Sequence, residues 1–263
     1  MKYYVISDPH GFYDETMNTL VAAGYFADTG EKKLLLLGDL LDRGEQPNEI
    51  VRFMIEEDKA GRLIYVTGNH EDLMDNALSE INDNNDVRCA SAPWTHHYGN
   101  GTWNTILLLS GMSESEADAH PRALVQMVRS HDFYRYLRGR TVDYFETEHY
   151  VFTHGFIPCN AVGYPYVVSA TYMENWREAA PEEWRRARWY NGMQMCGKFG
   201  LKIPGKTVVV GHWRASYGHH EFEGRCPECG EGADYTPYYG DGIIAIDACT
   251  KISGFVNCIV LED

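Results

Sequence analysis

The stretch that decides the fold is Lys33-Leu34-Leu35-Leu36-Leu37-Gly38-Asp39-Leu40-Leu41-Asp42-Arg43-Gly44. Its first half is a short apolar run, which is typical of a strand buried on both faces. Its second half places two carboxylates and a guanidinium between glycines, where that strand ends. In open α/β sheets, ligands bind outside the carboxyl ends of the strands. The stretch therefore predicts a buried strand that carries charged side chains to a ligand site.

Six other short apolar runs predict further strands. Helical spacing lies between the first of them, in a segment after Asp14 and in one after Pro47, which suits the first turn of a helix. Strands that alternate with helices indicate a sheet covered by helices. The expected strands are Lys2–Ser7, Lys33–Leu37, Leu63–Thr67, His149–Thr153, Thr207–Val210, Gly242–Ile246 and Gly254–Leu261.

Two segments do not fit this alternation. Residues 71–148 predict a mainly helical insertion, with helices at Asp72–Ile81 and Pro121–Leu137. The aromatic and Arg-rich segment Tyr172–Phe199 also predicts helix, and we expect residues 172–200 to form a cap. Without a repeat or a low-complexity linker, we expect residues 1–263 to form a single domain.

Composition narrows the class of protein. The chain has 263 residues and a formal net charge of −15, which disfavours nucleic acid and anionic lipid as partners. No apolar run is long enough to cross a membrane, and a carboxylate at Asp8 comes too early for a signal peptide. We therefore expect a cytoplasmic protein, whose seven cysteines are reduced thiols. The sequence leaves the oligomeric state open.

Five of the predicted strands end in Asp, His or Asn, mostly beside glycine. A single Asp in such a place usually caps a helix or closes a turn, and a single His is more often a hydrogen-bonded core residue. Five such residues, each at the carboxyl end of a predicted strand, predict a metal site. Oxygen and imidazole ligands suit manganese first, with iron or zinc as alternatives. The candidate ligands are Asp8, His10, Asp39, Asn69, His154 and His212.

These motifs resemble the signature of the calcineurin-like metallophosphoesterases. The matching segments are Asp8-x-His10-Gly11, Gly38-Asp39-x-x-Asp42-Arg43-Gly44, Gly68-Asn69-His70-Glu71, Thr153-His154-Gly155, Gly211-His212 and Asp247-Ala248-Cys249-Thr250. Within that family the chain resembles the phosphoprotein-phosphatase branch, which includes Ser/Thr phosphatases and symmetrical diadenosine-tetraphosphate hydrolases. The resemblance implies an α/β fold, a four-layer α/β/β/α sandwich with a helical insertion and two transition-metal ions at one edge.

The resemblance also implies a role for each matched residue. Asp8, His10 and Asp39 would hold the first metal. Asp39, Asn69, His154 and His212 would hold the second, so that Asp39 bridges the two. His70, oriented by Asp42, would protonate the leaving-group oxygen. Arg43 would clamp the phosphate with its planar fork, and Asn69 could also contact it. The plainer alternatives are a structural histidine for His70 and an ion pair for Arg43.

The chain departs from the family pattern in three places. Ser7 stands where the family usually has glycine, and Pro9 separates the first two ligands. The second phosphate-binding arginine has no motif here. We expect Arg188, while Arg185, Arg186 or Arg214 could serve, and a solvated basic helix face is an equal alternative.

Two further signals are weak. Cys226 and Cys229 could hold a structural zinc with His219 and His220, but one short pair of cysteines favours two thiols in a surface loop. The aromatic residues Trp176, Trp184, Trp189 and Tyr190 favour helix packing over a base-stacking platform, although they fall in the expected cap. We expect His96 and His97 at the surface.

Together these features predict a phosphatase that hydrolyses phosphate monoesters by metal-activated water. The sequence has no Cys or Ser nucleophile motif. As the substrate we expect a protein phosphorylated on Ser or Thr, or a small phosphoester. The alternative is a symmetrical bis(5′-nucleosyl)-tetraphosphatase, and the net charge disfavours a nuclease. A non-catalytic binding module is the alternative of another class; it would have lost a ligand or His70, and none is lost.

Overall fold

Two sheets form the centre of the computed structural model, which describes residues 1–164 and 166–263. In the first sheet, β1 (Lys2–Ile6), β2 (Lys32–Leu37) and β3 (Leu63–Val66) run parallel, and β11 (Cys258–Glu262) pairs antiparallel with β1. The second has the order β4-β5-β8-β10-β9. Its strands are Tyr144–Glu146, Tyr150–Thr153, Thr207–Val210, Ile243–Ala245 and Tyr238–Gly240.

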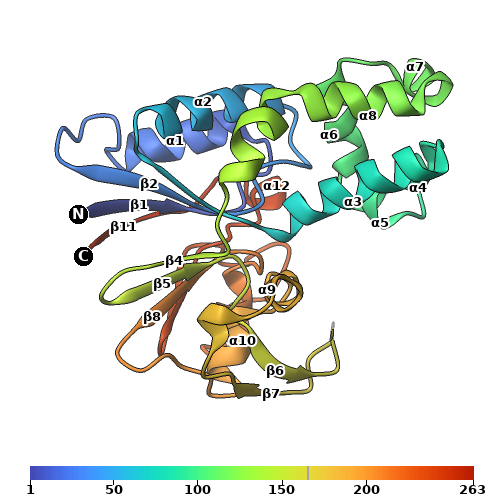
Figure 1. Cartoon of the computed structure of the whole chain (residues 1–263). Coiled ribbons are helices and arrows are strands. Elements are labelled where there is room, and N and C mark those ends of the chain that lie inside the picture. Colours follow the sequence, from blue (N-terminus) through green and yellow to red (C-terminus); the bar gives the residue numbers. More distant parts are fainter. Residues whose placement is uncertain (165) are drawn as a thin grey trace.

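The sheets pack face to face (Figure 1). Leu34 to Leu37 on β2 are all fully buried, because both faces of the strand are covered. Successive side chains of a strand point to opposite faces. Leu35 and Leu37 meet Phe152 and Val209 of the second sheet, whereas Leu34 and Leu36 pack against the outer helices. The apolar run thus serves two cores at once.

Helices cover both outer faces, which completes the four-layer α/β/β/α sandwich (Figure 1). On the first sheet lie α1 (Tyr13–Ala22) and α2 (Pro47–Lys59), which begins at a proline as expected. On the second sheet lie α9 (Pro181–Ala187) and α10 (Gly192–Gly197), whose side chains join those of β8 and β10 in a separate core.

A group of helices extends from the edge of the first sheet (Figure 1). It begins with α3 (Asn69–Asn84) and continues through α4 (Arg88–Ser91), α5 (His96–Gly99), α6 (Thr102–Ser110), α7 (Glu114–Ala119) and α8 (Pro121–Ser130). A π-helical turn, η1 (Phe133–Leu137), and a 3-10 turn, η2 (Arg138–Arg140), lead back to β4.

All seven expected strands are present, but three helical expectations need correction. The helix expected at 121–137 breaks at His131, whose ψ of 149° is extended. The helical insertion expected at 71–148 ends earlier, because 144–146 form β4. The segment 172–199 is only partly helical, with the 3-10 turn η3 (Trp176–Glu178), α9 and α10.

Four strands have no counterpart in the sequence expectations: β4, β9 and the hairpin β6 (Cys159–Val162) and β7 (Ser169–Tyr172). Two short helices, α11 (Ser216–Glu221) and α12 (Thr250–Ser253), follow β8 and β10. No helix among the described residues is both long and apolar enough to cross a lipid bilayer.

Candidate metal centre

The ends of β1, β2, β3, β5 and β8 bring their polar residues together at one edge of the sandwich. Several of these residues hold a left-handed backbone, which costs an L-amino acid free energy and concentrates at functional sites. Eight non-glycine residues of the described chain have positive φ, and all but Asn85 lie at this edge or next to it. They are Asp8, His10, Asp39, Asp42, Arg43, His212 and Cys249.

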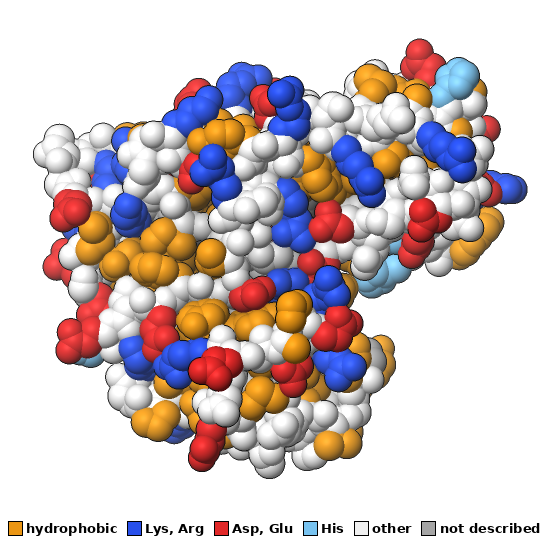
Figure 2. All heavy atoms as spheres, in the orientation of Figure 1, with side chains coloured by type: hydrophobic (Ala, Val, Ile, Leu, Met, Phe, Trp, Pro, Cys, Tyr) orange, Lys and Arg blue, Asp and Glu red, His pale blue; other side chains and the backbone are white. Residues whose placement is uncertain are grey.

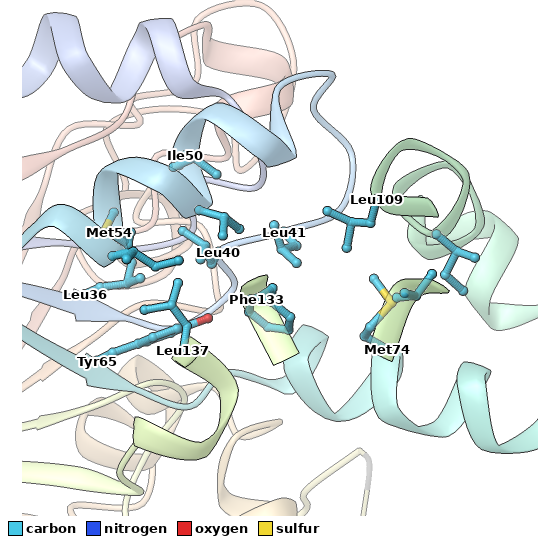
Figure 3. Packing of buried hydrophobic residues seen from close by; sticks show 14 of the residues in the cluster. Leu36, Leu40, Leu41, Ile50, Met54, Tyr65, Met74, Leu109, Phe133 and Leu137 are labelled. Carbon is cyan, nitrogen blue, oxygen red and sulfur yellow. The ribbon is translucent and has the colours of Figure 1, made fainter. Parts of the chain in front are cut away.

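Apolar packing and one carboxylate fix the central loop. Leu40 and Leu41, between Asp39 and Asp42, point into the core near Ile50 and Phe133 (Figure 3). Glu71 accepts hydrogen bonds from the backbone N–H groups of Gly68 (2.7 Å), Asp39 (3.0 Å) and Leu40 (2.9 Å) and from Tyr65 Oη (2.7 Å). The start of α3 is thereby tied to the loop after β2.

Asp39 belongs to two clusters of potential ligands. In the first, its carboxylate meets His10 and His70, and all three ligand atoms lie within 4.8 Å of one another. Asp8 adjoins this cluster, with Oδ1 4.0 Å from His10 Nε2. In the second, Asp39 meets His154 and His212 within the same limit. One shared carboxylate between two clusters matches the arrangement expected for a bridging ligand.

The tautomers of the buried histidines leave their Nε2 atoms unprotonated and able to bind a cation, although His10 Nε2 here accepts a hydrogen bond from Arg43 Nη1 at 2.7 Å. His10 Nδ1 donates to the Leu41 carbonyl (2.9 Å), and His154 Nδ1 donates to the Leu37 carbonyl (2.6 Å). His154 Nε2 then faces the carbonyl oxygen of Asn69 at 2.8 Å, with no proton between two acceptors. His212 Nε2 is buried without a hydrogen-bond partner among the described residues. A metal ion would satisfy these atoms, so the donor set fits one.

Electrostatics at the centre also favour bound cations. Burial lowers the pKa of His154 to about 4 and holds the pKa values of His10 and His212 well below the usual range, so all three are neutral ligands at pH 7. Burial raises the pKa of Asp8, and the charges of Asp247 and Asp39 raise it further. Cations would stabilise these crowded carboxylates in their charged form.

Within the first cluster, His70 is held in a chain of hydrogen bonds. His70 Nδ1 donates to Asp42 Oδ2 at 2.7 Å, and Thr102 Oγ1 donates to the same oxygen at 2.7 Å. Arg43 spans the two histidines, with Nη1 2.7 Å from His10 Nε2 and Nη2 3.0 Å from His70 Nε2. These contacts fix the orientation of His70 and place a guanidinium against the first cluster.

The candidate second arginine is not free. Arg188 is 7% exposed, and its guanidinium forms ion pairs with Asp72 and Asp143. It would have to leave one of these acids to reach a substrate. Arg185 pairs with Glu182 on an exposed face, and Arg214 pairs with Glu228.

Sequence reasoning missed three contributions to the site. The motif Gly68-Asn69-His70-Glu71 gives Glu71 no role of its own. Thr102 comes from α6, sixty positions after Asp42. The expectation that His96 and His97 lie at the surface is wrong for His97, which is 6% exposed. His96 is exposed, but its ring lies 5.7 Å from that of Trp189, which lies 5.7 Å from His212. The helical group and the second half of the chain thus meet beside the centre, where Figure 2 shows a notch with a histidine at its edge.

The zinc site considered at Cys226 and Cys229 gains no support. Across residues 1–164 and 166–263, neither cysteine belongs to a group of three potential ligands. His219 is engaged by Glu223 and the Thr236 carbonyl, and His220 Nδ1 donates to the Cys226 carbonyl. Both cysteines are free thiols. This agrees with the alternative of two thiols in a surface loop.

Comparison with known proteins shows the family. The model of the calcineurin-like phosphoesterases matches residues 1–216. Asymmetrical bis(5′-nucleosyl)-tetraphosphatases named PrpE, from Bacillus velezensis and Bacillus subtilis, are each 38% identical over 76 residues, which is 27% of this chain and only 30% and 31% of their own length.

A solved structure assigned as a candidate diadenosine tetraphosphatase has a TM-score of 0.50 and 13% identity, covering 99% of this chain and 89% of its own. At this identity the likeness concerns the fold alone. Because the family model spans most of the chain, the chain belongs to the calcineurin-like phosphoesterases.

Proposed function

We propose that this phosphoesterase cleaves the polyphosphate chain of a dinucleoside polyphosphate. The observation that carries the proposal is the shared Asp39, which lies in two clusters of potential histidine ligands. Two metals held there would supply positive charge and an activated water for in-line displacement at phosphorus. The names of the PrpE relatives support the choice of substrate.

The chain's own residues would divide the remaining work. Asp8, His10 and Asp39 would hold one metal, and Asn69, His154 and His212 would complete the other around Asp39. Manganese is the first candidate, with iron or zinc as alternatives. All of these ligands except the half-buried His212 are at most 2% exposed, and hydrogen bonds to backbone groups hold Asp8, His10 and His154, which favours a preorganised centre.

Proton transfer and phosphate binding would fall to other residues. His70 would protonate the leaving-group oxygen with a proton carried on Nε2 while its Nδ1 stays fixed on Asp42, and Arg43, whose Nη2 lies 3.0 Å from Nε2, would first have to turn to the phosphate. Arg43 would bind the phosphate, with Asn69 as a further contact. Arg188 would join them only after releasing Asp72 or Asp143. A positive charge at Arg43 offsets the acidity of the chain where an anionic substrate must enter.

The test compares three substrates in the presence of Mn²⁺: diadenosine tetraphosphate, a phosphoserine peptide and 4-nitrophenyl phosphate. We expect the highest kcat/KM with diadenosine tetraphosphate, and its products will separate asymmetrical cleavage (ATP and AMP) from symmetrical cleavage (two ADP). A higher kcat/KM for the phosphopeptide would instead support a Ser/Thr phosphatase. No hydrolysis with any divalent metal would favour a binding module.

His70→Asn tests the acid role. The amide cannot give up a proton, so we expect kcat to fall about 10²–10⁴-fold with a poor leaving group such as phenol. The loss should be smaller with 4-nitrophenol, which leaves readily without a proton. Equal rates for the variant and the wild type would refute the assignment.

A further inference from the structure

The histidine ligand of the second cluster is flanked by tryptophans that line a cleft. The cleft has a volume of about 280 Å³ and lies between Trp189, Trp213, Tyr217 and the segment 166–168. The His212 ring lies 5.7 Å from the Trp189 ring and 6.0 Å from the Trp213 ring. Tyr217 follows, 6.2 Å from Trp213. An aromatic surface therefore begins at the candidate metal centre and leads away from it.

These aromatic residues differ from those that build the core. Trp176 and Trp184 are 0% and 2% exposed, and both pack with Tyr144 inside the second half of the molecule. Trp189 and Trp213 are only partly buried and border open space. Packing explains the first pair but does not require the second.

Not all polar groups of the cleft residues have a partner within the described part of the protein. Trp213 Nε1 is buried and has no acceptor among the described residues, although a buried indole N–H normally has one. Asn191, 7% exposed, uses its Oδ1 to accept from the Gln194 N–H at 3.1 Å. Its Nδ2 amino group can then donate a hydrogen bond to a ligand. The described residues that line the cleft include no charged side chain.

An uncharged, aromatic cleft with donors at its edge suits a flat heterocycle. We infer that this cleft binds the nucleobase of the substrate while the attached phosphate lies at the metal centre. This assignment of the cleft rests on the proposed function. In a nucleoside phosphate only a ribose separates base from phosphate, and here only the width of His212 separates cleft from cluster. Stacking on aromatic side chains contributes about 1–3 kcal/mol per base.

The first measurement compares Mn²⁺-loaded wild type on diadenosine tetraphosphate and on inorganic tripolyphosphate, which has the same anhydride bond but no base. We expect kcat/KM to favour the nucleotide. In Tyr217→Leu and Trp213→Leu this preference should fall roughly 5–150-fold, the equivalent of one lost stacking contact. Tyr239→Leu, on the exposed strand β9, is the matched control and should keep the preference.

The second measurement is binding of adenosine, followed by quenching of tryptophan fluorescence in the Mn²⁺-loaded protein. We expect quenching in the wild type and a weaker affinity in Tyr217→Leu, whose fold is checked by its Tm. This arm stands even if the protein hydrolyses neither substrate, in which case the proposed function fails separately. The inference is overturned if adenosine does not bind, if the preference survives both variants, or if a phenylalanine-flanked phosphopeptide binds more tightly than adenosine.

Discussion

Thr102→Val isolates the hydrogen bond that reaches His70 from the helical group. Thr102 is fully buried on α6, and Asp42 Oδ2 accepts from both Thr102 Oγ1 and His70 Nδ1, each at 2.7 Å. The other carboxylate oxygen, Oδ1, has no partner within the described residues. Valine keeps the shape of threonine but removes the donor, so Asp42 would depend on His70 alone.

The magnitude follows from the charge on Asp42. A hydrogen bond to a charged buried group contributes about 1.5–3 kcal/mol, so we expect the free energy of unfolding to fall by about that amount. If the transition state is destabilised by roughly half of this free energy, kcat for phenyl phosphate falls about tenfold. With 4-nitrophenyl phosphate, whose leaving group needs little protonation, the fall should be smaller.

Thr105→Val is the matched control. Thr105 is equally buried, one turn further along α6, but its hydroxyl makes only a 3.4 Å contact with the Gly101 carbonyl. We expect it to cost under about 1 kcal/mol and to leave the leaving-group dependence unchanged. Urea denaturation and the two aryl phosphates provide both readouts. The reasoning is refuted if both variants lose equal stability, or if Thr102→Val slows both substrates by the same factor.

Three further substitutions, one of them with a control at Gly61, test other parts of the site and the fold. Gly38→Ala would place Cβ 2.5 Å from the Gly68 Cα at a φ of +82°, so urea denaturation should show a loss of roughly 3 kcal/mol or more. Gly61→Ala, with φ +68° and no atom within 4 Å, should lose only about 1–2 kcal/mol; equal losses would contradict the steric argument. Asp39→Asn should lower the metal content, measured by mass spectrometry, from two ions to at most one per chain; two retained ions would exclude a bridging role. Glu57→Gln tests a carboxylate remote from the centre, whose pKa burial would raise but hydrogen bonds from Arg62 (2.7 and 2.8 Å) keep below its usual value. Because the folded pKa is depressed, the stabilisation is complete above the unfolded value of about 4.3 and disappears as pH falls below it. The variant should therefore lose about 1–2 kcal/mol at pH 7 and nearly nothing at the lowest pH at which the fold survives; a loss independent of pH would refute the linkage.

The strands could be predicted because their signal is local. Each expected strand is an apolar run, and Leu34 to Leu37 are fully buried since both faces of β2 are covered. The missed strands are short and half-exposed: β7 is Ser-Ala-Thr-Tyr, and its pairing with β6 joins residues seven to thirteen positions apart. Residues 172–199 look helical by composition, but the chain makes only short helices there, between Pro181 and Gly197.

The candidate ligands could be predicted for a related reason. Parallel strands share one carboxyl edge, so residues that follow five strands in sequence become neighbours in space. Thr102 and Trp213 could not be found in this way. Thr102 meets Asp42 across sixty positions, and Trp213 matters only because the cleft opens beside it. No pattern in their own segments distinguishes them from other buried or aromatic residues.

This difference separates the chemistry of the site from its specificity. The ligand loops hold a strained left-handed backbone at Asp39 and Asp42, and the compensation is local: Leu40 and Leu41 anchor the loop in the core and Glu71 binds its N–H groups. The surfaces that would meet the rest of the substrate come from α5 and the segments around Trp189 and Trp213, which the sheets support but do not dictate. Substitutions there can change the substrate without moving a ligand. Comparing the substrate preferences of cleft variants at constant metal content would therefore measure specificity apart from catalysis.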